Sequence, residues 1–250
     1  MFTGEELQHA AHELDERTYR QEFQARFENL GTGIVYYAFD REQDVRPLEY
    51  SERIGLFWSL DFNIDPMCSV IGQQLGYQKV YVLDELVLPN SNTQAACQAF
   101  LERTRPWIRK SHLPIELRIY GDATGNSRTS SASRTDWRIV RDFFKSHTAL
   151  YQTTFSIGSS NPRVKDRVNC VNALLQNQAG ERRLSIDPRC RHLILDLERV
   201  HWKEDGYGNP VPDIDKSDPA RTHVSDALGY MIAAKFSMYG SSGPRAGILV

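Results

Sequence analysis

The chain has 250 residues, of which 40% are hydrophobic and 25% are charged, and its formal net charge is -2. This length supports one sizeable α/β core. No run approaches the roughly 18 consecutive apolar residues that a membrane span needs, and the first residues lack the features of a signal peptide. The four cysteines form no CxxC pair and lie among apolar residues. They indicate reduced core thiols rather than a zinc site or a disulfide framework.

Charge is distributed unevenly along the chain. Residues 1–52 contain twelve Asp and Glu against five Lys and Arg, whereas residues 100–145 contain ten Lys and Arg against five Asp and Glu. Residues 163–191 contain seven against three. A basic half in an acidic chain suits a protein with one side facing phosphate. Solvated helix faces give the same pattern and are the commoner reason for any single run.

The first segment is polar, acidic and helix-forming over residues 5–30, where apolar residues recur at helical spacing. Glycines at 31 and 33 end that pattern, and a short apolar run follows over 34–39. We interpret residues 1–52 as an N-terminal extension packed on the main domain, or as the tail of a preceding domain.

The pattern changes at Gly55. Three apolar runs over 56–61, 68–72 and 79–83 are separated by turn residues and predict three strands. Their short connections indicate an antiparallel meander.

Helical and strand patterns alternate in the rest of the chain. The expected elements are a helix over 93–107 stopped near Pro106, a strand over 115–120, a helix over 134–145, a strand over 150–157, a helix from 161–162, a helix over 189–200, a loop or hairpin over 203–220, and a final helix through Ala234. Thr222 is the expected side-chain cap of that final helix. This order predicts an α/β fold with a mixed five-stranded sheet, an antiparallel meander of three followed by two parallel strands, flanked by helices.

Four acidic residues lie where predicted elements end or begin. Asp61 closes the first strand, Glu85 lies at the end of the third, Asp122 ends the fourth, and Asp226 is in the first turn of the final helix. If the first and fourth strands are parallel neighbours, their ends lie about 4.7–4.9 Å apart. Carboxylates so close repel one another unless a cation neutralises them, and all-oxygen ligation favours Mg²⁺ or Mn²⁺. Taken singly, each acid is also an ordinary turn, strand-end or helix N-terminal residue.

Asp122 stands between two glycines in the segment YGDATG. A plain turn is the simpler interpretation, and a phosphate-binding loop is excluded because GxxxxGK[ST] is absent. The alternative is that Gly121 and Gly125 let a metal ion and a DNA phosphate approach Asp122 closely.

Four segments carry a resemblance to a known family: LFWSLDFNIDP, VLDELVLP, YGDATG and DKSDPARTHVSDALGY. They resemble the nuclease domain of the large terminase subunit of tailed double-stranded DNA bacteriophages, from about Gly55 to Tyr230. The resemblance implies a ribonuclease H-like fold over 53–238, an extension over 1–52 that is similar to the end of the ATPase domain, and a flexible tail over 239–250. The Walker A loop of the family's ATPase domain has no counterpart in this sequence, so we expect no ATPase motif in this chain.

The resemblance also implies a catalytic site. Asp61, Asp122 and Asp226 match the metal-binding acidic triad of the family, and Glu85 matches a frequent additional catalytic acid. Two ions, Mg²⁺ or Mn²⁺, would activate a water and stabilise the leaving oxygen of a phosphodiester. Asp61, at the centre of the sheet, is the candidate to bridge both ions.

Basic residues beside these acids are the expected DNA contacts. Arg128 and Arg134 follow the strand that ends at Asp122, and Lys216 and His223 lie just before Asp226. The last two can neutralise the scissile phosphate or steady the water, although a solvated lysine and a satisfied core histidine are the ordinary alternatives. The resemblance implies double-stranded DNA as substrate, the small terminase subunit and the portal as partners, no membrane, and the host cytoplasm as location.

The leading hypothesis is therefore a metal-dependent DNA endonuclease that cuts concatemeric viral DNA during phage genome packaging. Two others stay open. The first is another ribonuclease H-like nuclease, such as a junction resolvase, and the second is a non-catalytic DNA-clamping or docking module. The identity of the auxiliary acid is open as well, because Asp84 or Asp65 are alternatives to Glu85.

Overall fold

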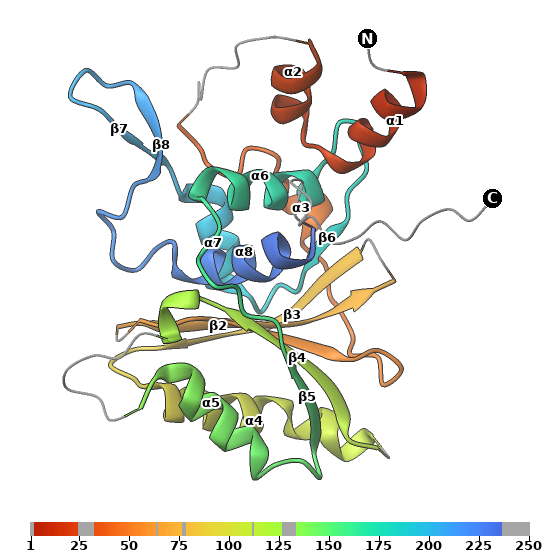
Figure 1. Cartoon of the computed structure of the whole chain (residues 1–250), viewed down its shortest axis with the longest axis vertical. Helices are drawn as coiled ribbons and strands as arrows, with labels where there is room; N and C mark the ends of the chain where they lie inside the picture. The colour runs from red at the N-terminus through yellow and green to blue at the C-terminus, as the bar shows by residue number, and fades with distance from the viewer. Residues whose placement is uncertain are drawn as a thin grey trace.

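A computed structural model describes residues 3–24, 33–63, 65–76, 79–111, 113–126 and 134–236. Within them, one mixed sheet separates two layers of helices (Figure 1). Its strands are β1 (Leu56–Asp61), β2 (Met67–Leu75), β3 (Lys79–Leu88), β4 (Ile115–Gly121), β5 (Tyr151–Phe155) and β6 (Leu184–Ile186). One face is covered by α4 (Thr93–Lys110) and α5 (Asp136–Lys145), and the other by α6 (Val164–Leu175), α7 (Arg191–Arg199) and α8 (His223–Lys235). We call these the α4–α5 face and the α8 face.

The strand order is β5-β4-β1-β2-β3-β6. Strands β1, β2 and β3 form an antiparallel meander, while β4 is parallel to β1 and β5 is parallel to β4. This confirms the predicted meander followed by two parallel strands. The ends of β1 and β4 lie side by side, because Leu60 pairs with Gly121.

A sixth strand, β6, was not predicted. It is only three residues long and pairs in parallel with β3. Backbone hydrogen bonds hold it at both ends, from Val80 N to Arg183 O at 2.8 Å and from Asp187 N to Val82 O at 2.9 Å. Three residues are too few to show the alternation by which a strand is recognised in a sequence.

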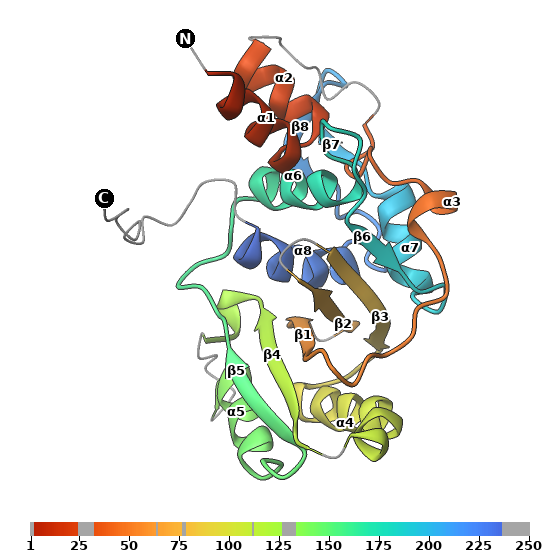
Figure 2. The ribbon, with the colours of Figure 1, turned by 90° about the vertical axis from the view of Figure 1, so that its right-hand side faces the viewer.

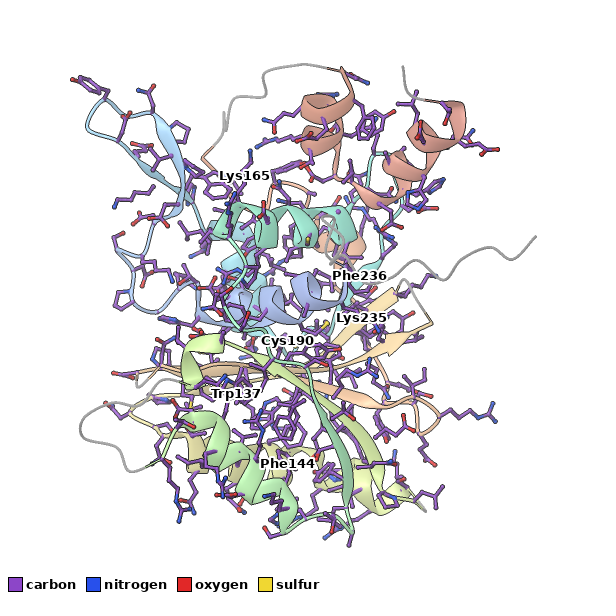
Figure 3. The ribbon with its side chains drawn as sticks, in the orientation of Figure 1. Trp137, Phe144, Lys165, Cys190, Lys235 and Phe236 are labelled. Atoms are coloured by element: carbon purple, nitrogen blue, oxygen red, sulfur yellow. The ribbon has the colours of Figure 1, made fainter. Side chains whose placement is uncertain are left out.

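The α4–α5 face has an aromatic core. Trp58 of β1 stacks on Phe100 of α4 with ring centroids 4.5 Å apart. Trp137 and Phe144 lie between α5 and the sheet (Figure 3), and Tyr151 of β5 closes the cluster. All five side chains are fully buried. Aromatic rings of this size dominate the energetics of a core.

Helix α4 extends beyond its predicted end. It continues through Pro106 to Lys110, and Ser111 N bonds to Trp107 O and Ile108 O to close the last turn. Proline costs a helix one backbone hydrogen bond. Here Trp107 stacks on Tyr50 with ring centroids 5.1 Å apart, and this contact supports the turn beyond the proline.

Helix α8 crosses the opposite face, directly over the sheet and beneath α6 (Figure 1). Every residue from 224 to 233 is buried. A helix that is apolar nearly all round is typically a buried one. Polar groups on α8 therefore need partners inside the protein.

The N-terminal segment packs on the α8 face of the main domain. Helices α1 (Gly4–Glu13) and α2 (Glu16–Gln24) lie beyond α6, on the side away from the sheet (Figure 2). The predicted apolar run contributes Val35 and Tyr36 to the core, and Val35 N bonds to Val200 O at 2.9 Å. Helix α3 (Arg41–Asp44) follows. The boundary at residue 52 stays a prediction.

The predicted hairpin is present as β7 (Trp202–Glu204) and β8 (Pro210–Ile214), which project from the domain (Figure 1). The predicted tail at 239–250 lies outside the described residues. In the part of the chain that is described, no helix is long and apolar enough to cross a membrane. The four cysteines are buried, and none of them forms a disulfide within the described residues.

Candidate metal centre

Two of the predicted ligands come from neighbouring strand ends. Asp61 is the last residue of β1, and Asp122 directly follows β4. Asp122 N donates to Leu60 O at 3.1 Å, which continues the β1–β4 pairing to this point. Both carboxylates are buried. The predicted juxtaposition of the two acids is therefore present.

The glycines around Asp122 are packed closely against other parts of the protein. A Cβ at Gly121, whose φ is +151°, would lie 2.4 Å from Leu60 O, and one at Gly125 would lie 2.5 Å from the ring of Phe62. Both positions need glycine because other parts of the protein approach them closely. Their predicted role in admitting a metal ion and a DNA phosphate stays a prediction.

The carboxylate of Asp122 is held by its own turn. It accepts hydrogen bonds from Thr124 N at 2.7 Å, from Thr124 Oγ1 at 2.6 Å and from Asn161 Nδ2 at 2.7 Å. Trp137 Nε1 donates to the backbone oxygen of Asp122 at 2.8 Å and ties the turn to α5. The turn interpretation and the ligand interpretation are thus both compatible with this segment.

Asp61 faces the start of α8. His223 Nδ1 lies 3.1 Å from Asp61 Oδ2, and the amide of Asn63 also contacts this oxygen. Burial raises the pKa of Asp61, the hydrogen bond from His223 opposes that shift, and the charges of Asp226 and Asp122 add to it. The pKa of His223 is raised in turn by its hydrogen bond to Asp61. Asp61 is therefore close enough to Asp226 and Asp122 to experience their charges.

Asp226 lies in the first turn of α8 and carries two cationic partners. Arg167 Nη2 pairs with Asp226 Oδ1, and Lys216 Nζ lies 3.2 Å from Asp226 Oδ2. Lys216 comes from the loop that joins β8 to α8, whereas Arg167 comes from α6. Both oxygens of this carboxylate are therefore engaged by positive charge.

The start of α8 is fixed from α7 and not by Thr222. Thr222 has a φ of 76° and makes no side-chain cap, so the predicted cap is wrong. Asp196 of α7 instead accepts a hydrogen bond from Ser225 N at 3.1 Å. Burial raises the pKa of Asp196 to about 6. A cap from a distant helix leaves no local sequence signal, because the usual motif lies within one turn.

The carboxylate of Glu85 points to the N-terminus of α7. Its carboxylate accepts hydrogen bonds from His192 N at 2.8 Å and Leu193 N at 2.9 Å, at the N-terminus of α7. Free backbone N–H groups at a helix start favour such a negative partner. This arrangement makes Glu85 a helix cap, and the described geometry gives no support to the predicted catalytic role.

The two alternatives to Glu85 also have partners of their own. Asp84 pairs with Arg103 at 2.6 Å, and Asp65 accepts a hydrogen bond from Asn90 N at 3.1 Å. Neither carboxylate is bonded to a residue of the candidate centre.

The predicted DNA contacts are divided between two regions. Lys216 and His223 are at the centre, as described above. Arg134 lies just before α5, is exposed, and approaches Asp142 to 3.9 Å. Arg128 lies outside the described residues.

The donor set suits a hard divalent cation in its chemistry, since Asp61, Asp122 and Asp226 offer only oxygen. It is not assembled into a coordination cluster. Over the described ranges, no group of three or more His, Cys, Asp or Glu side chains is arranged to hold a metal ion. The reason is visible in the hydrogen bonds: Asp122 is turned to its loop, and Asp226 is turned to Arg167 and Lys216.

Arg167 is the functional candidate that was missed in the sequence. It lies in the apolar stripe of α6 between Val164 and Val171, where an arginine is unexpected. A charged residue in a buried stripe needs a buried counter-ion. That position was the available signal, although it does not identify Asp226 as the partner.

Comparison with known proteins identifies the fold. No family model matches the chain, and no curated protein does either. The large terminase of the thermophilic bacteriophage D6E superposes with a TM-score of 0.63 at 12% identity, covering 93% of this chain and 52% of that one. Its complex with ATP-gamma-S gives a TM-score of 0.64. The likeness shows the fold.

This chain spans about half the length of the D6E protein, with 52% of it covered. A more distant match is the nuclease domain of the large terminase from bacteriophage SPP1 with bound Mn, at a TM-score of 0.44 and 18% identity, covering 75% of this chain and 94% of that one. The terminase-like fold agrees with the predicted fold class.

Proposed function

We propose that this chain is a divalent-metal-dependent endodeoxyribonuclease that cuts concatemeric viral DNA during phage genome packaging. The observation that carries the proposal is that three elements, each with a buried carboxylate, converge at one end of the sheet. Asp61 and Asp122 end adjacent parallel strands, and Asp226 begins the helix that crosses above them. Carboxyl ends of strands are where open α/β sheets bind ligands, and the terminase-like fold agrees with the resemblance of the sequence motifs.

Each carboxylate has a proposed task. Asp61, which experiences the charges of the other two acids, would bridge two Mg²⁺ or Mn²⁺ ions, while Asp122 and Asp226 would each hold one. When bound, the ions supply activation of a water and stabilisation of the leaving oxygen. His223 orients Asp61 through the 3.1 Å contact with its Oδ2.

We propose that the DNA reaches the metal centre across a cationic rim of the protein, which is formed by Lys216 and Arg134. The side chain of Lys216 is 57% exposed beside Asp226, so its ammonium can contact a phosphate without losing water entirely. Arg134 extends the rim toward α5. Double-stranded DNA is the proposed substrate, and the small terminase subunit and the portal are proposed partners.

A second function deserves a test because of one observation. Arg167 and Lys216 neutralise Asp226, and the acids are not assembled into a coordination cluster. A DNA-clamping module with vestigial acids would have the same features. It would bind DNA with strong salt dependence and would not need a metal ion.

The deciding experiment is cleavage of supercoiled plasmid with Mn²⁺, with Mg²⁺ and with chelator. We expect nicked and linear DNA only with metal, with little sequence preference because phosphate contacts carry no base information. Asp61→Asn should be inactive, while Asp213→Asn, which changes an exposed acid on β8, should be as active as wild type. Binding without cleavage under all conditions would support the clamp. Preference for a branched junction or an RNA–DNA hybrid in a substrate panel would favour another nuclease of this fold.

A further inference from the structure

The two cations on Asp226 differ in how firmly they are held. The side chain of Arg167 is 5% exposed and that of Lys216 is 57% exposed. Arg167 comes from α6, within the core, and Lys216 from the loop before α8. One carboxylate therefore has one buried and one solvated positive partner, on different oxygens.

The side chain of Arg167 is held in place by its neighbours in the core. Its guanidinium lies over the ring of Tyr230, 4.8 Å from the centroid. A Cβ at Gly229 would come within 2.7 Å of Arg167 Cδ, so the glycine leaves room for the arginine to pass α8. Its Nε is buried and makes no hydrogen bond. If it left Asp226, a buried guanidinium would lose its counter-ion, which is strongly unfavourable.

Lys216 has none of these constraints. It makes a single contact with Asp226, at 3.2 Å, and more than half of its side chain is in water. A solvated ion pair of this kind is weak. When another cation takes its place, the ammonium can move into solvent or onto a phosphate at little cost.

We propose that Arg167 and Lys216 form a cation clamp on Asp226, in which Arg167 permanently fixes Oδ1 and Lys216 occupies Oδ2 until a divalent cation displaces it. The inference rests on the proposed function, because it assumes that Asp226 is a metal ligand. It makes Arg167 a positioning residue that leaves Asp226 only Oδ2 to offer. It also gives a reason why both oxygens of Asp226 are engaged by positive charge.

The clamp predicts a competition that can be measured without DNA. Mn²⁺ is titrated into wild type and into Lys216→Met by calorimetry. We expect the variant to bind Mn²⁺ about two- to fivefold more tightly, the factor set by the strength of an exposed ion pair. Lys165→Met is the matched control, because Lys165 lies on α6 on the side away from the sheet (Figure 3) and lines a cavity beside α2. Its affinity should equal that of wild type.

The outcomes separate the clamp from the proposed function. Wild type that binds Mn²⁺ while Lys216→Met binds it no more tightly would overturn the clamp alone. Wild type that binds neither Mn²⁺ nor Mg²⁺ would overturn both. Because Lys216 is exposed, its variant is not expected to fail to fold.

Arg167→Met tests the positioning part by the sign of its effect. Removal of a positive charge should by itself strengthen cation binding, whereas loss of a positioning contact weakens it by about tenfold or more. We expect weaker Mn²⁺ binding, with a lowered melting temperature in chelator that a second change, Asp226→Asn, partly restores. Stronger Mn²⁺ binding by Arg167→Met would show that Arg167 acts only as a charge and would overturn its positioning role.

Discussion

The two faces of the sheet are built from the same strands but hold different chemistry. In β1, Trp58 and Leu60 point into the aromatic core of the α4–α5 face, while Ser59 and Asp61 point toward α8. Alternation of side chains along a strand allows this division. Both faces have apolar packing, and the α8 face in addition buries Asp61, Asp226 and Arg167. The candidate chemistry is thus confined to one side of the sheet.

Buried polar atoms that lack a hydrogen-bond partner are found near the start of α8, and their burial lowers the stability of this face. Three buried atoms there, Arg167 Nε, Asp196 Oδ1 and Thr222 Oγ1, make no hydrogen bond. Buried polar atoms without a partner are uncommon and destabilising. The α8 face therefore holds charges and unpartnered polar atoms whose burial the apolar packing of both faces must offset, and each of the following changes tests one face.

The largest effect is expected from Phe100→Ala on the α4–α5 face. Phe100 is fully buried against Trp58 and Phe144, so its truncation should lower the free energy of unfolding by about 3–5 kcal/mol. Urea denaturation in chelator measures it. Leu113→Ala, at a 77% exposed leucine, is the control and should change the free energy by less than about 0.5 kcal/mol. A Phe100 variant that loses less than about 1 kcal/mol would contradict a major contribution of the aromatic core to stability.

The next effect concerns Asp122→Asn on the opposite side. Without metal, its free energy of unfolding should remain within about 1 kcal/mol of wild type, because an amide can still bond Thr124 and Asn161. With Mn²⁺ at a hundredfold excess over the dissociation constant, wild type should gain about 2.7 kcal/mol. The variant should gain much less. Thermal melts with chelator and with Mn²⁺ compare the two. If the variant is clearly unstable in chelator yet keeps the Mn²⁺ shift, Asp122 is a turn residue only.

A comparable effect, confined to a pH window, is expected from Asp196→Asn, which removes a buried charge from the α8 face. The pKa of Asp196 is raised from 3.8 to about 6 by burial, so the folded state binds its proton more tightly than the unfolded state does. The free energy of unfolding therefore falls as the pH rises from about 4 to about 6. At about 1.4 kcal/mol per pKa unit, the loss above pH 6 is about 3 kcal/mol.

Asp196→Asn should remove this contribution while its amide oxygen still accepts the hydrogen bond from Ser225 N. The difference between variant and wild type isolates the group, because all other titrations occur in both proteins. Urea denaturation from pH 4.5 to pH 7.5 measures it, and we expect the variant to be the more stable protein only at the upper end. Parallel curves would mean that Arg221, 4.0 Å away, already compensates the charge.

The comparison of the faces also explains what the sequence could reveal. Local patterns in the sequence predict the meander and the helices. The adjacency of Asp61 and Asp122 follows from one topological rule, that the ends of neighbouring parallel strands lie side by side. The structure contains all of these features. The partners of the charged groups do not follow, because they join distant elements: Arg167 and Asp226 are 59 positions apart. Glu85 looked equivalent to the other acids in the sequence. Only the position of α7 makes it a helix cap.

The smallest effect on stability is expected from Arg134→Glu, just before α5. Arg134 is 65% exposed and 3.9 Å from Asp142, which Arg138 also contacts at 3.0 Å, so the free energy of unfolding should change by less than about 0.5 kcal/mol. DNA affinity should fall, and the slope of its logarithm against the logarithm of salt concentration should become shallower by roughly 0.9, the value for one lost phosphate contact.

Arg53→Glu is the matched control for that change. Arg53 is exposed and lies just before β1 begins, so it is at the opposite end of this strand from Asp61. Fluorescence anisotropy with a labelled duplex at several salt concentrations gives both slopes, and Mn²⁺ binding by calorimetry should be unchanged in both variants. Equal losses of affinity would mean that DNA responds only to the net charge of the protein. A loss confined to Arg134→Glu would extend the phosphate-facing rim from Lys216, on the α8 face, to the start of α5.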